Sequence, residues 1–171
     1  FKKACKEYGI SIIGGDTNAG KEIVFNVCIF GNSKNIVTRK GSNEEDLIFV
    51  TGPFGYTSIG LNILMNNKKE ENNFVKKSIK SVINPKPKLS FGLKNKKYFS
   101  SSMDSSDGLS TTLNEMAKQS GKKFIVNKMP SNKDLESYVK KKNLNLNSII
   151  FNGGEEYEFA FTVPVKYRKN I

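Results

Sequence analysis

Apolar residues recur along this chain either at every second position or at every third to fourth position. Each change from one spacing to the other marks the start of another expected element. Alternation or short apolar runs predict strands, and spacings of three and four predict helices. Strands are expected at residues 10–13, 22–30, 47–51, 98–103, 123–127 and 159–163. Helices are expected at residues 1–8, 59–64, 74–83, 89–95, 109–120 and 132–140, with a solvated loop at 68–73 and a short lead at 149–152 into the next turn. Because strands and helices interleave, the predicted fold class is α/β (α+β).

A polar, glycine-containing stretch, residues 31–46, separates two parts of this pattern. We predict a domain boundary inside it, with residues 1–42 in one domain and residues 43–171 in the next. The chain begins at Phe1, not Met, and stops at Ile171 soon after an expected strand. These two ends lead us to expect a fragment or a processed chain.

The charge of the chain is strongly positive, because 28 Lys and Arg face 16 Asp and Glu, a formal net charge of +12. Such an excess raises nucleic-acid or membrane-surface binding as a hypothesis. However, Lys and Asn are abundant throughout, and the aromatic residues show no interleaving with the charges of the kind found in RNA-binding modules. We expect no nucleic-acid partner, while an anionic small substrate is compatible with the charge.

Residue types that are absent narrow the chemistry further. The chain contains no His, which excludes histidine-based zinc sites, Ser-His-Asp triads and Cys-His nucleophiles from these residues. Cys5 and Cys28 lie far apart and outside any CxxC pair, so nothing implies an oxidising compartment. No apolar run reaches membrane-spanning length and no signal peptide is visible. A soluble, cytoplasmic protein without a membrane partner is expected.

The most informative chemistry lies between an expected strand and an expected helix, where Asp104 and Asp107 stand three residues apart. Free N–H groups and the positive end of the helix dipole favour phosphate oxygens there, and carboxylates suit the Mg²⁺ that phosphates carry. The alternative is that Ser106 or Asp107 only caps the helix. A nucleotide site is the first hypothesis, and it depends on a matching site elsewhere.

Two further turns repeat this arrangement. Asp16 follows Gly14-Gly15, and Glu155 and Glu156 follow Gly153-Gly154. Small residues let the backbone approach a ligand while a carboxylate projects from the turn. Dispersed single acids suit Mg²⁺, which takes one or two carboxylates with phosphate oxygens and water. Phosphoryl transfer needs mainly positioning and charge neutralisation, so we assign no catalytic general base.

Simpler alternatives exist for these pieces. Asp16 could be an Asx-turn residue that holds a hairpin, and Arg39 could be a linker charge. The turn Gly52-Pro53-Phe54-Gly55 could cradle phosphate, but it lacks the Gly-Lys-Ser/Thr ending of a P-loop. We therefore favour a purely architectural role for that turn.

Taken in order, these motifs resemble the thiamine-monophosphate kinase family, which belongs to the superfamily of aminoimidazole ribonucleotide synthetase and selenophosphate synthetase. The resemblance covers nearly the whole chain and rests on six segments: Gly14-Gly15-Asp16-Thr17, Arg39-Lys40-Gly41-Ser42, Val50-Thr51-Gly52-Pro53-Phe54-Gly55, Pro85-Lys86-Pro87-Lys88, Asp104-Ser105-Ser106-Asp107-Gly108-Leu109 and Gly153-Gly154-Glu155-Glu156-Tyr157-Glu158. The last segment separates this family from its superfamily relatives. Glu156 stands where the family usually has Asp, and Ser42 where it has Ala.

The resemblance implies a fold and an activity. Residues 1–42 would be the C-terminal portion of an N-terminal ATP-binding domain, and residues 43–171 an α/β C-terminal domain of the aminoimidazole ribonucleotide synthetase-like type. The implied reaction is ATP-dependent, Mg²⁺-dependent phosphorylation of thiamine monophosphate to thiamine diphosphate in a homodimer. A half-domain before Phe1, with an Asp-rich metal loop, and an aromatic residue after Ile171 would be missing. We therefore expect this chain alone to be inactive.

Site residues follow from the resemblance position by position. ATP would be bound by Gly15, Asp16, Arg39 and Ser106; Mg²⁺ by Asp16, Asp104 and Asp107; and the thiamine substrate by Glu155. Two alternatives stay open: another ATP-using enzyme of the same superfamily, and a non-catalytic basic binding module motivated by the charge.

Overall fold

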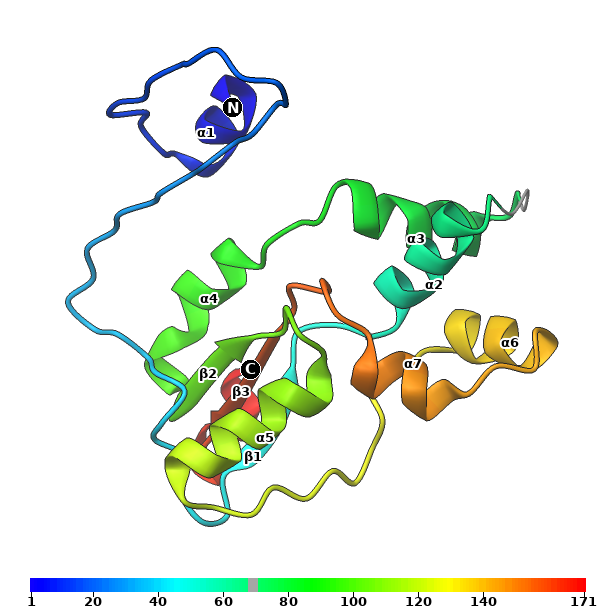
Figure 1. The fold of residues 1–171 in the computed structure, drawn as a ribbon. Coiled ribbons are helices and arrows are strands. Elements are labelled where there is room, and N and C mark those ends of the chain that lie inside the picture. Colours follow the sequence, from blue (N-terminus) through cyan, green and yellow to red (C-terminus); the bar gives the residue numbers. More distant parts are fainter. Residues whose placement is uncertain (68–70) are drawn as a thin grey trace. The chain divides into compact units, whose positions relative to one another are not determined.

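The computed structural model describes residues 1–67 and 71–171. Contacts divide these residues into two compact units, unit 1 (Phe1–Lys34) and unit 2 (Asn35–Ile171). The predicted domain boundary after residue 42 stays a prediction. Of the predicted loop at residues 68–73, residues 68–70 lie outside the described residues, and α3 (Asn73–Ile83) begins at its last residue (Figure 1).

Unit 1, all of whose residues are described, begins with α1 (Lys2–Tyr8). The helix ends at Gly9, whose φ of 65° is left-handed and whose N–H donates to the Cys5 carbonyl. Glycine is the usual residue for this way of ending a helix. The helix and its stop are therefore confirmed as the sequence predicts them.

The strands predicted at residues 10–13 and 22–30 are wrong for this chain. Residues 10–34, all of them described, contain neither helix nor strand, and Ile23 is 88% exposed. A strand is stabilised when a neighbouring strand pairs its N–H and C=O groups. The alternating pattern specifies which side chains would share a buried face, but unit 1 supplies no strand to pair with.

In the described part of unit 2, three strands form one antiparallel sheet in the order β1-β3-β2. They are β1 (Leu47–Val50), β2 (Ser101–Asp104) and β3 (Phe159–Val163). All three match predicted strands. β2 begins later than predicted because Lys96–Tyr98 forms a short 3₁₀ helix, η1.

The two faces of the sheet pack against different helices. Ala160 of β3 belongs to the main core, together with residues of α5 (Leu109–Ser120). On the opposite face the ring of Phe161 contacts three other rings, those of Phe49, Phe91 and Phe99. Phe91 lies on α4 (Leu89–Asn95), so α5 and α4 lie on opposite faces. Aromatic pairs of this kind contribute about 0.5–1.5 kcal/mol each beyond area burial.

The remaining helices of unit 2 are α2 (Tyr56–Met65), α3, α6 (Lys133–Lys141), α7 (Leu146–Asn152) and the 3₁₀ helix η2 (Val165–Asn170). α2 and α3 approach closely at Gly60, where a Cβ would lie 2.1 Å from the Ser78 carbonyl oxygen. The ring of Phe74 on α3 packs against Tyr56 of α2 and Tyr138 of α6, with ring centroids 5.1 Å and 4.8 Å apart. The sequence predicts α7 only as a short lead.

Asparagine side chains begin three of these helices. Asn72, Asn132 and Asn145 each accept a hydrogen bond from the backbone N–H three residues on, at 2.9–3.0 Å. This is the favoured N-cap chemistry, worth about 1 kcal/mol per helix. Asparagine caps therefore define the starts of α3, α6 and α7.

The strand predicted at residues 123–127 is also wrong. The chain leaves α5 at the left-handed Gly121, and residues 122–127 form no regular element. Phe124 packs against the core, whereas Ile125 is 67% exposed. As in unit 1, the apolar pattern is present and no described strand pairs with it. Among the described residues, no helix has the length and apolar character needed to cross a membrane.

Candidate functional site

The first predicted acidic turn lies between β2 and α5. Asp104 is the last residue of β2, and Gly108 precedes α5 with a φ of 97°. The start of α5 has no side-chain cap hydrogen bond, in contrast to the asparagine-capped helices. The alternative that Ser106 or Asp107 caps this helix is therefore wrong. Asp104 and Asp107 are both exposed.

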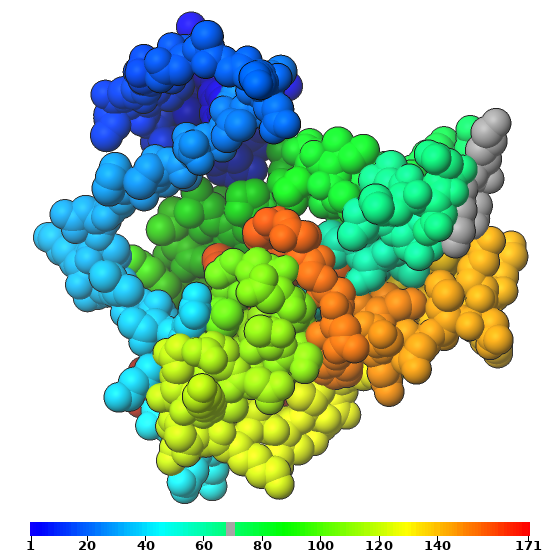
Figure 2. Space-filling model, in the orientation of Figure 1, coloured from blue at the N-terminus to red at the C-terminus, as the bar shows by residue number. Residues whose placement is uncertain are grey.

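The third predicted acidic turn, residues 153–158, packs against the first. The N–H of Ser105 donates to the Glu158 carbonyl at 2.9 Å, and the N–H of Tyr157 donates to the Ser105 carbonyl at 3.0 Å. The Glu155 N–H donates to the Ser106 carbonyl at 2.6 Å. These bonds extend the pairing of β2 with β3 past the strand ends. Figure 2 shows the third turn (orange) beside the start of α5 (yellow-green).

Glycines allow this close approach. A Cβ on Gly154 would lie 2.7 Å from the Ser106 carbonyl oxygen, and one on Gly153 would lie 1.7 Å from Ser58 Oγ. A Cβ on Gly108 would lie 3.0 Å from the Phe151 carbonyl oxygen. Backbone and a helical side chain fill the space that any larger residue would need. Packing thus explains these glycines: Gly154 lies against the first turn, Gly153 against Ser58 of α2, and Gly108 against the end of α7 and the start of the third turn.

Tyr157 is a residue of this corner that the sequence reasoning did not assign. Its hydroxyl donates to Glu155 Oε2, and both residues have left-handed backbone, with φ of 62° at Glu155 and 52° at Tyr157. The hydrogen bond to Glu155, then burial, then the charges of Glu155, Asp104 and Asp107 raise the pKa of Tyr157. Three carboxylates therefore act on one phenol. Its place two residues after Glu155 was the available signal.

Glu156 faces the start of α2 instead. Its Oε1 accepts hydrogen bonds from the N–H groups of Gly55, at 2.5 Å, and Thr57, at 3.3 Å. Burial raises the pKa of Glu156, although these hydrogen bonds oppose the rise. A carboxylate of the chain itself thus takes the N–H groups that a phosphate would need. This supports the architectural role predicted for the turn at residues 52–55.

Glu158 fixes the other end of the third turn. Its carboxylate accepts the Thr51 hydroxyl hydrogen and forms an ion pair with Lys88, Nζ to Oε1 3.0 Å. Together with Glu156 it lines a groove of about 260 Å³ that also carries four lysines, Lys77, Lys80, Lys86 and Lys88. Glu156 and Glu158 are therefore held on the lysine-lined side of the turn.

Arg39 is exposed on a segment that runs along the free edge of β2. The Ser102 N–H donates to the Thr38 carbonyl at 2.9 Å, and the N–H groups of Gly41 and Ser42 donate to Ser120 Oγ at 3.2 Å. The segment is therefore tied to β2 and to the end of α5. Whether Arg39 contacts ATP stays a prediction.

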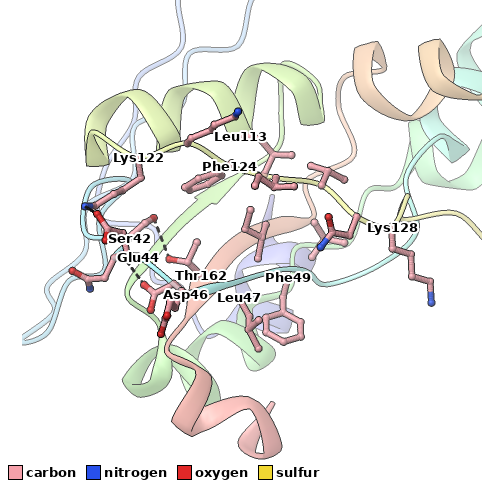
Figure 3. Close-up of a pocket in the computed structure, with 18 of the residues that line it drawn as sticks. Ser42, Glu44, Asp46, Leu47, Phe49, Leu113, Lys122, Phe124, Lys128 and Thr162 are labelled. Atoms are coloured by element: carbon pink, nitrogen blue, oxygen red, sulfur yellow. Dashed lines mark hydrogen bonds and ion pairs between the residues drawn. The ribbon is translucent and has the colours of Figure 1, made fainter.

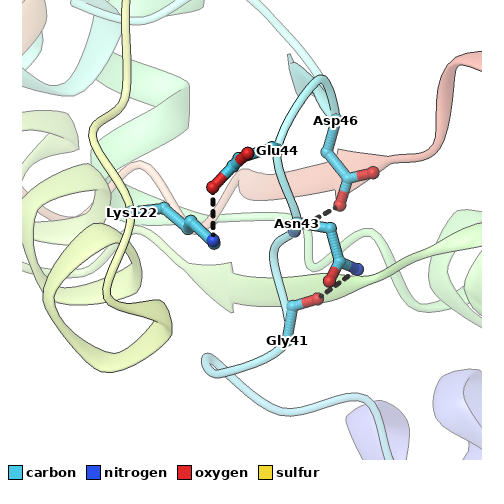
Figure 4. A network of polar contacts seen from close by, with 5 residues as sticks. All are labelled: Gly41, Asn43, Glu44, Asp46 and Lys122. Atoms are coloured by element: carbon cyan, nitrogen blue, oxygen red, sulfur yellow. Dashed lines mark hydrogen bonds and ion pairs between the residues drawn. The ribbon is translucent and has the colours of Figure 1, made fainter.

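Farther along, the turn at residues 41–46 has its own polar contacts, shown in Figure 4. The Asn43 N–H donates to Asp46 Oδ2 at 2.8 Å, and Lys122 pairs with Glu44 at 2.9 Å. The Lys122 hydrogen bond and charge lower the pKa of Glu44. These contacts fasten the entry to β1 onto the end of α5.

Gly15 and Asp16 lie in unit 1, and both are exposed. Asp16 accepts hydrogen bonds from the Thr17 N–H at 2.8 Å and from Asn18 Nδ2 at 3.1 Å. These are local turn contacts, and no hairpin accompanies them in the described residues 10–34. A Mg²⁺ role for Asp16 stays a prediction.

The donor set in unit 2 suits a magnesium–phosphate complex better than an all-protein metal cage. The described residues contain no group of three or more His, Cys, Asp or Glu side chains that could hold a metal ion. Mg²⁺ commonly uses one or two carboxylates and takes its other ligands from phosphate and water. Asp104 and Asp107 supply two exposed carboxylates of this kind. Between them Ser105 Oγ is buried, with no hydrogen-bond partner among the described residues.

A larger groove of about 850 Å³ lies elsewhere, between β1 and residues 122–128 (Figure 3). Leu47, Phe49 and Phe124 line it, with Glu44, Asp46 and Lys122 near one end. None of the predicted ATP, Mg²⁺ or substrate residues is among those that line it. Cavity size therefore does not identify the candidate site, which is the exposed corner of Asp104, Asp107 and Glu155.

The chain is similar in sequence and in structure to thiamine-monophosphate kinases. The chain is 63% identical over 171 residues to the thiamine-monophosphate kinase of Nitrosopumilus maritimus (strain SCM1), an alignment that covers the whole chain and 54% of that protein. The crystal structure of thiamine monophosphate kinase from Aquifex aeolicus superimposes with a TM-score of 0.82 at 28% identity, covering 96% of this chain and 57% of that one. A structure of AaThiL complexed with AMPPCP and TMP gives a TM-score of 0.70 at 32% identity, covering 76% and 43%.

No model of a protein family matches the chain. The chain spans about half the length of the curated relatives it matches. The solved structures confirm the predicted mixed α/β fold of the aminoimidazole ribonucleotide synthetase-like type. By its identity along its full length and by its fold, the chain belongs to the thiamine-monophosphate kinase family.

Proposed function

We propose that these residues belong to an enzyme that transfers the γ-phosphoryl group of ATP to thiamine monophosphate, forming thiamine diphosphate. The observation that carries the proposal is the backbone pairing of residues 104–108 with residues 153–158. This pairing gathers two exposed aspartates and a glutamate at one corner of unit 2. The names of the relatives, and the AaThiL complex with TMP and the ATP analogue AMPPCP, support the choice of substrates.

In this proposal the acidic corner serves the phosphates and the thiamine part separately. Asp104 and Asp107 hold Mg²⁺, and Ser106 hydrogen-bonds ATP. Glu155, which accepts the Tyr157 hydroxyl hydrogen, contacts the thiamine substrate. Bound Mg²⁺ supplies charge neutralisation for the phosphate oxygens. The backbone hydrogen bonds between the first and third turns fix the position of the aspartates relative to Glu155.

For residues 1–42 the proposal carries over the ATP contacts that the family resemblance implies. Asp16 holds Mg²⁺, Gly15 offers backbone to the nucleotide, and Arg39 contacts the ATP phosphates. During transfer, a phosphate oxygen of thiamine monophosphate forms a bond to the γ-phosphorus while the bond from that phosphorus to the leaving ADP oxygen breaks. This step needs alignment and charge neutralisation more than a general base.

The assembly and location of the enzyme are part of the proposal. We expect a homodimer, as the family resemblance implies, and a cytoplasmic location, where ATP is available. Size-exclusion chromatography with light scattering on the protein of full family length tests the first expectation, since a monomer at assay concentration contradicts it.

The activity is tested with that same protein. We expect it to convert thiamine monophosphate and Mg-ATP into thiamine diphosphate and ADP, measured by chromatography, and to lose the activity when EDTA removes Mg²⁺ and regain it when Mg²⁺ is restored. Thiamine and aminoimidazole precursors serve as competing substrates. Turnover of a non-thiamine substrate alone would assign the chain to another ATP-using enzyme, and binding of RNA without any turnover would favour the basic module.

A further inference from the structure

Neighbouring side chains of the third acidic turn serve opposite sides of it. Tyr157 donates its hydroxyl hydrogen to Glu155, close enough to Asp104 and Asp107 for both charges to act on the phenol. Glu156 instead lines the lysine groove. Its side chain therefore belongs to the back of the turn, away from the acidic corner. Glu156 shares the backbone of the turn with Glu155 and Tyr157, so its contacts help to fix the position of both.

The back of the turn is fastened to the first turn of α2 at two points. Glu156 Oε1 accepts from the N–H groups of Gly55 and Thr57, at 2.5 and 3.3 Å. The Thr57 hydroxyl donates to the Gly154 carbonyl at 2.7 Å. Gly154 and Glu156 are the two residues that flank Glu155. The start of α2 thus holds the chain on both sides of the predicted substrate residue.

Glu155 is held in a conformation that it would not adopt freely. Its φ of 62° lies in the left-handed region, which is disfavoured for residues with a Cβ. Such conformations persist where surrounding contacts determine them. On the front of the turn the fixing contact is the Glu155 N–H bond to the Ser106 carbonyl at 2.6 Å, and on the back it is the pair of α2 contacts. Loosening the back contacts would let the Glu155 carboxylate move.

We propose that Glu156 is a positioning residue of the substrate site, which binds the start of α2 and thereby holds Glu155 and Tyr157 in place to recognise the thiamine part of the substrate. The inference rests on the proposed function, because it assumes that Glu155 contacts thiamine. A carboxylate suits the task, since it accepts more than one N–H and its charge is favourable at a helix N-terminus. The family's usual Asp at this position carries the same group on a shorter side chain.

The test compares three replacements in the protein of full family length. Glu156→Ala removes the acceptor, and we expect the KM for thiamine monophosphate to rise about 10- to 100-fold, the scale of loss from small misplacement of a binding group. The KM for ATP should change much less. Glu156→Asp keeps a carboxylate and Glu156→Gln keeps an acceptor oxygen, so both should restore most of the lost affinity. Glu136→Ala is the matched control: it removes an exposed carboxylate on α6 that accepts the Ser131 hydroxyl, and it should leave both KM values unchanged.

The outcomes separate this inference from the proposed function. A wild-type protein that does not phosphorylate thiamine monophosphate contradicts the function itself. An active wild type together with a folded Glu156→Ala variant of unchanged KM overturns the positioning role, because a purely structural defect would lower the amount of active enzyme and leave KM alone. If Glu156→Ala does not fold, Thr57→Val is the second test. It removes the hydroxyl that donates to the Gly154 carbonyl and changes the side-chain volume little. It should raise the same KM, and an unchanged KM overturns the inference.

Discussion

Two turns of this chain share a Gly-Gly-acid sequence and differ in all that surrounds it. Gly14-Gly15-Asp16 lies in unit 1, where a Cβ on either glycine would meet no atom within 4 Å. Gly153-Gly154-Glu155 lies in unit 2, where a Cβ on Gly154 would lie 2.7 Å from the Ser106 carbonyl oxygen. At residues 153–155 the glycines are required by packing that the structure shows. At residues 14–16 nothing within unit 1 requires them.

The difference shows what a short motif specifies. Small residues and an acid make a close approach of backbone possible, but the approach forms only where the chain supplies the opposing surface. For Gly154 that surface is the turn after β2, which pairs with it through backbone hydrogen bonds. For Gly15 no such surface lies within residues 1–34, all of which are described. A short motif thus permits a close approach of the backbone, and the surrounding packing decides whether that approach forms.

The largest expected effect belongs to the acids. In the protein of full family length, Asp107→Asn should lower kcat/KM for thiamine phosphorylation by about 100-fold or more, the usual scale for losing one preorganised charge-stabilising group. Because Asp107 is exposed and caps no helix, the substitution should change the free energy of unfolding of the protein by no more than about 0.5 kcal/mol. Steady-state kinetics and thermal unfolding measure the two quantities.

Asp16→Asn in the same protein sharpens the comparison of the two turns. A loss as large as that of Asp107→Asn would mean that Asp16 is as important to the reaction as Asp107, whatever its packing in this chain. Asp134→Asn, exposed on α6, is the control and should retain full activity. Wild-type kinetics in Asp107→Asn would remove the acidic corner from the mechanism.

The next effect is on stability and distinguishes the two glycine pairs directly. Gly154→Ala in this chain should destabilise unit 2 by about 1–3 kcal/mol, because the new methyl group meets backbone that cannot move aside easily. Gly15→Ala should change stability by less than about 0.5 kcal/mol, since the space around it is open. Urea unfolding, followed by circular dichroism, measures both. Equal effects would erase the distinction between the turns.

Much of unit 2 could be predicted from the sequence because its signals are local. A short apolar run marked β1, alternation marked β3, and the apolar spacing after Gly108 marked α5 up to the glycine stop at Gly121. The acidic turns could also be found, because they depend on residue type and order. Family membership follows from the same ordered motifs, and identity along the full chain confirms it.

The failures share one physical cause. The strands predicted at 10–13, 22–30 and 123–127 need a partner, and a single strand's pattern carries no information about whether a partner is present. The roles of Glu156 and Tyr157 were missed for a related reason. Glu156 contacts the first turn of α2, and Tyr157 contacts Glu155. Both contacts depend on the three-dimensional path of the chain, which residue type alone does not predict.

A smaller effect, dependent on pH, tests how the third turn is buried. Burial raises the pKa of Glu156 above its ordinary value of 4.5, so the folded state holds this proton more tightly than the unfolded state. Protonated Glu156 therefore contributes to the free energy of unfolding. This contribution is fully present below pH 4.5 and is lost as the pH rises through the pKa of the folded state. Glu156→Gln does not titrate, so its melting temperature relative to wild type should increase across this window and then level off.

The control for that measurement is Glu136→Gln on α6, which makes the same Glu-to-Gln change at an exposed position. A difference for Glu156→Gln that is constant or shrinks as the pH rises would mean that Glu156 is not buried as described.

The smallest effect is expected from the ion pair at the end of the third turn. Lys88 Nζ lies 3.0 Å from Glu158, but its side chain is 36% exposed against 13% for Glu158. Lys88→Met keeps the aliphatic packing and removes the charge, and solvent screening should limit the loss of stability to at most about 1 kcal/mol. Because Glu158 also accepts the Thr51 hydroxyl, it keeps one partner when the lysine is gone. Urea unfolding at low and high salt measures the effect, and a loss of several kcal/mol would show that the turn depends on this ion pair more than on the glycine packing and backbone pairing that distinguish it from residues 14–16.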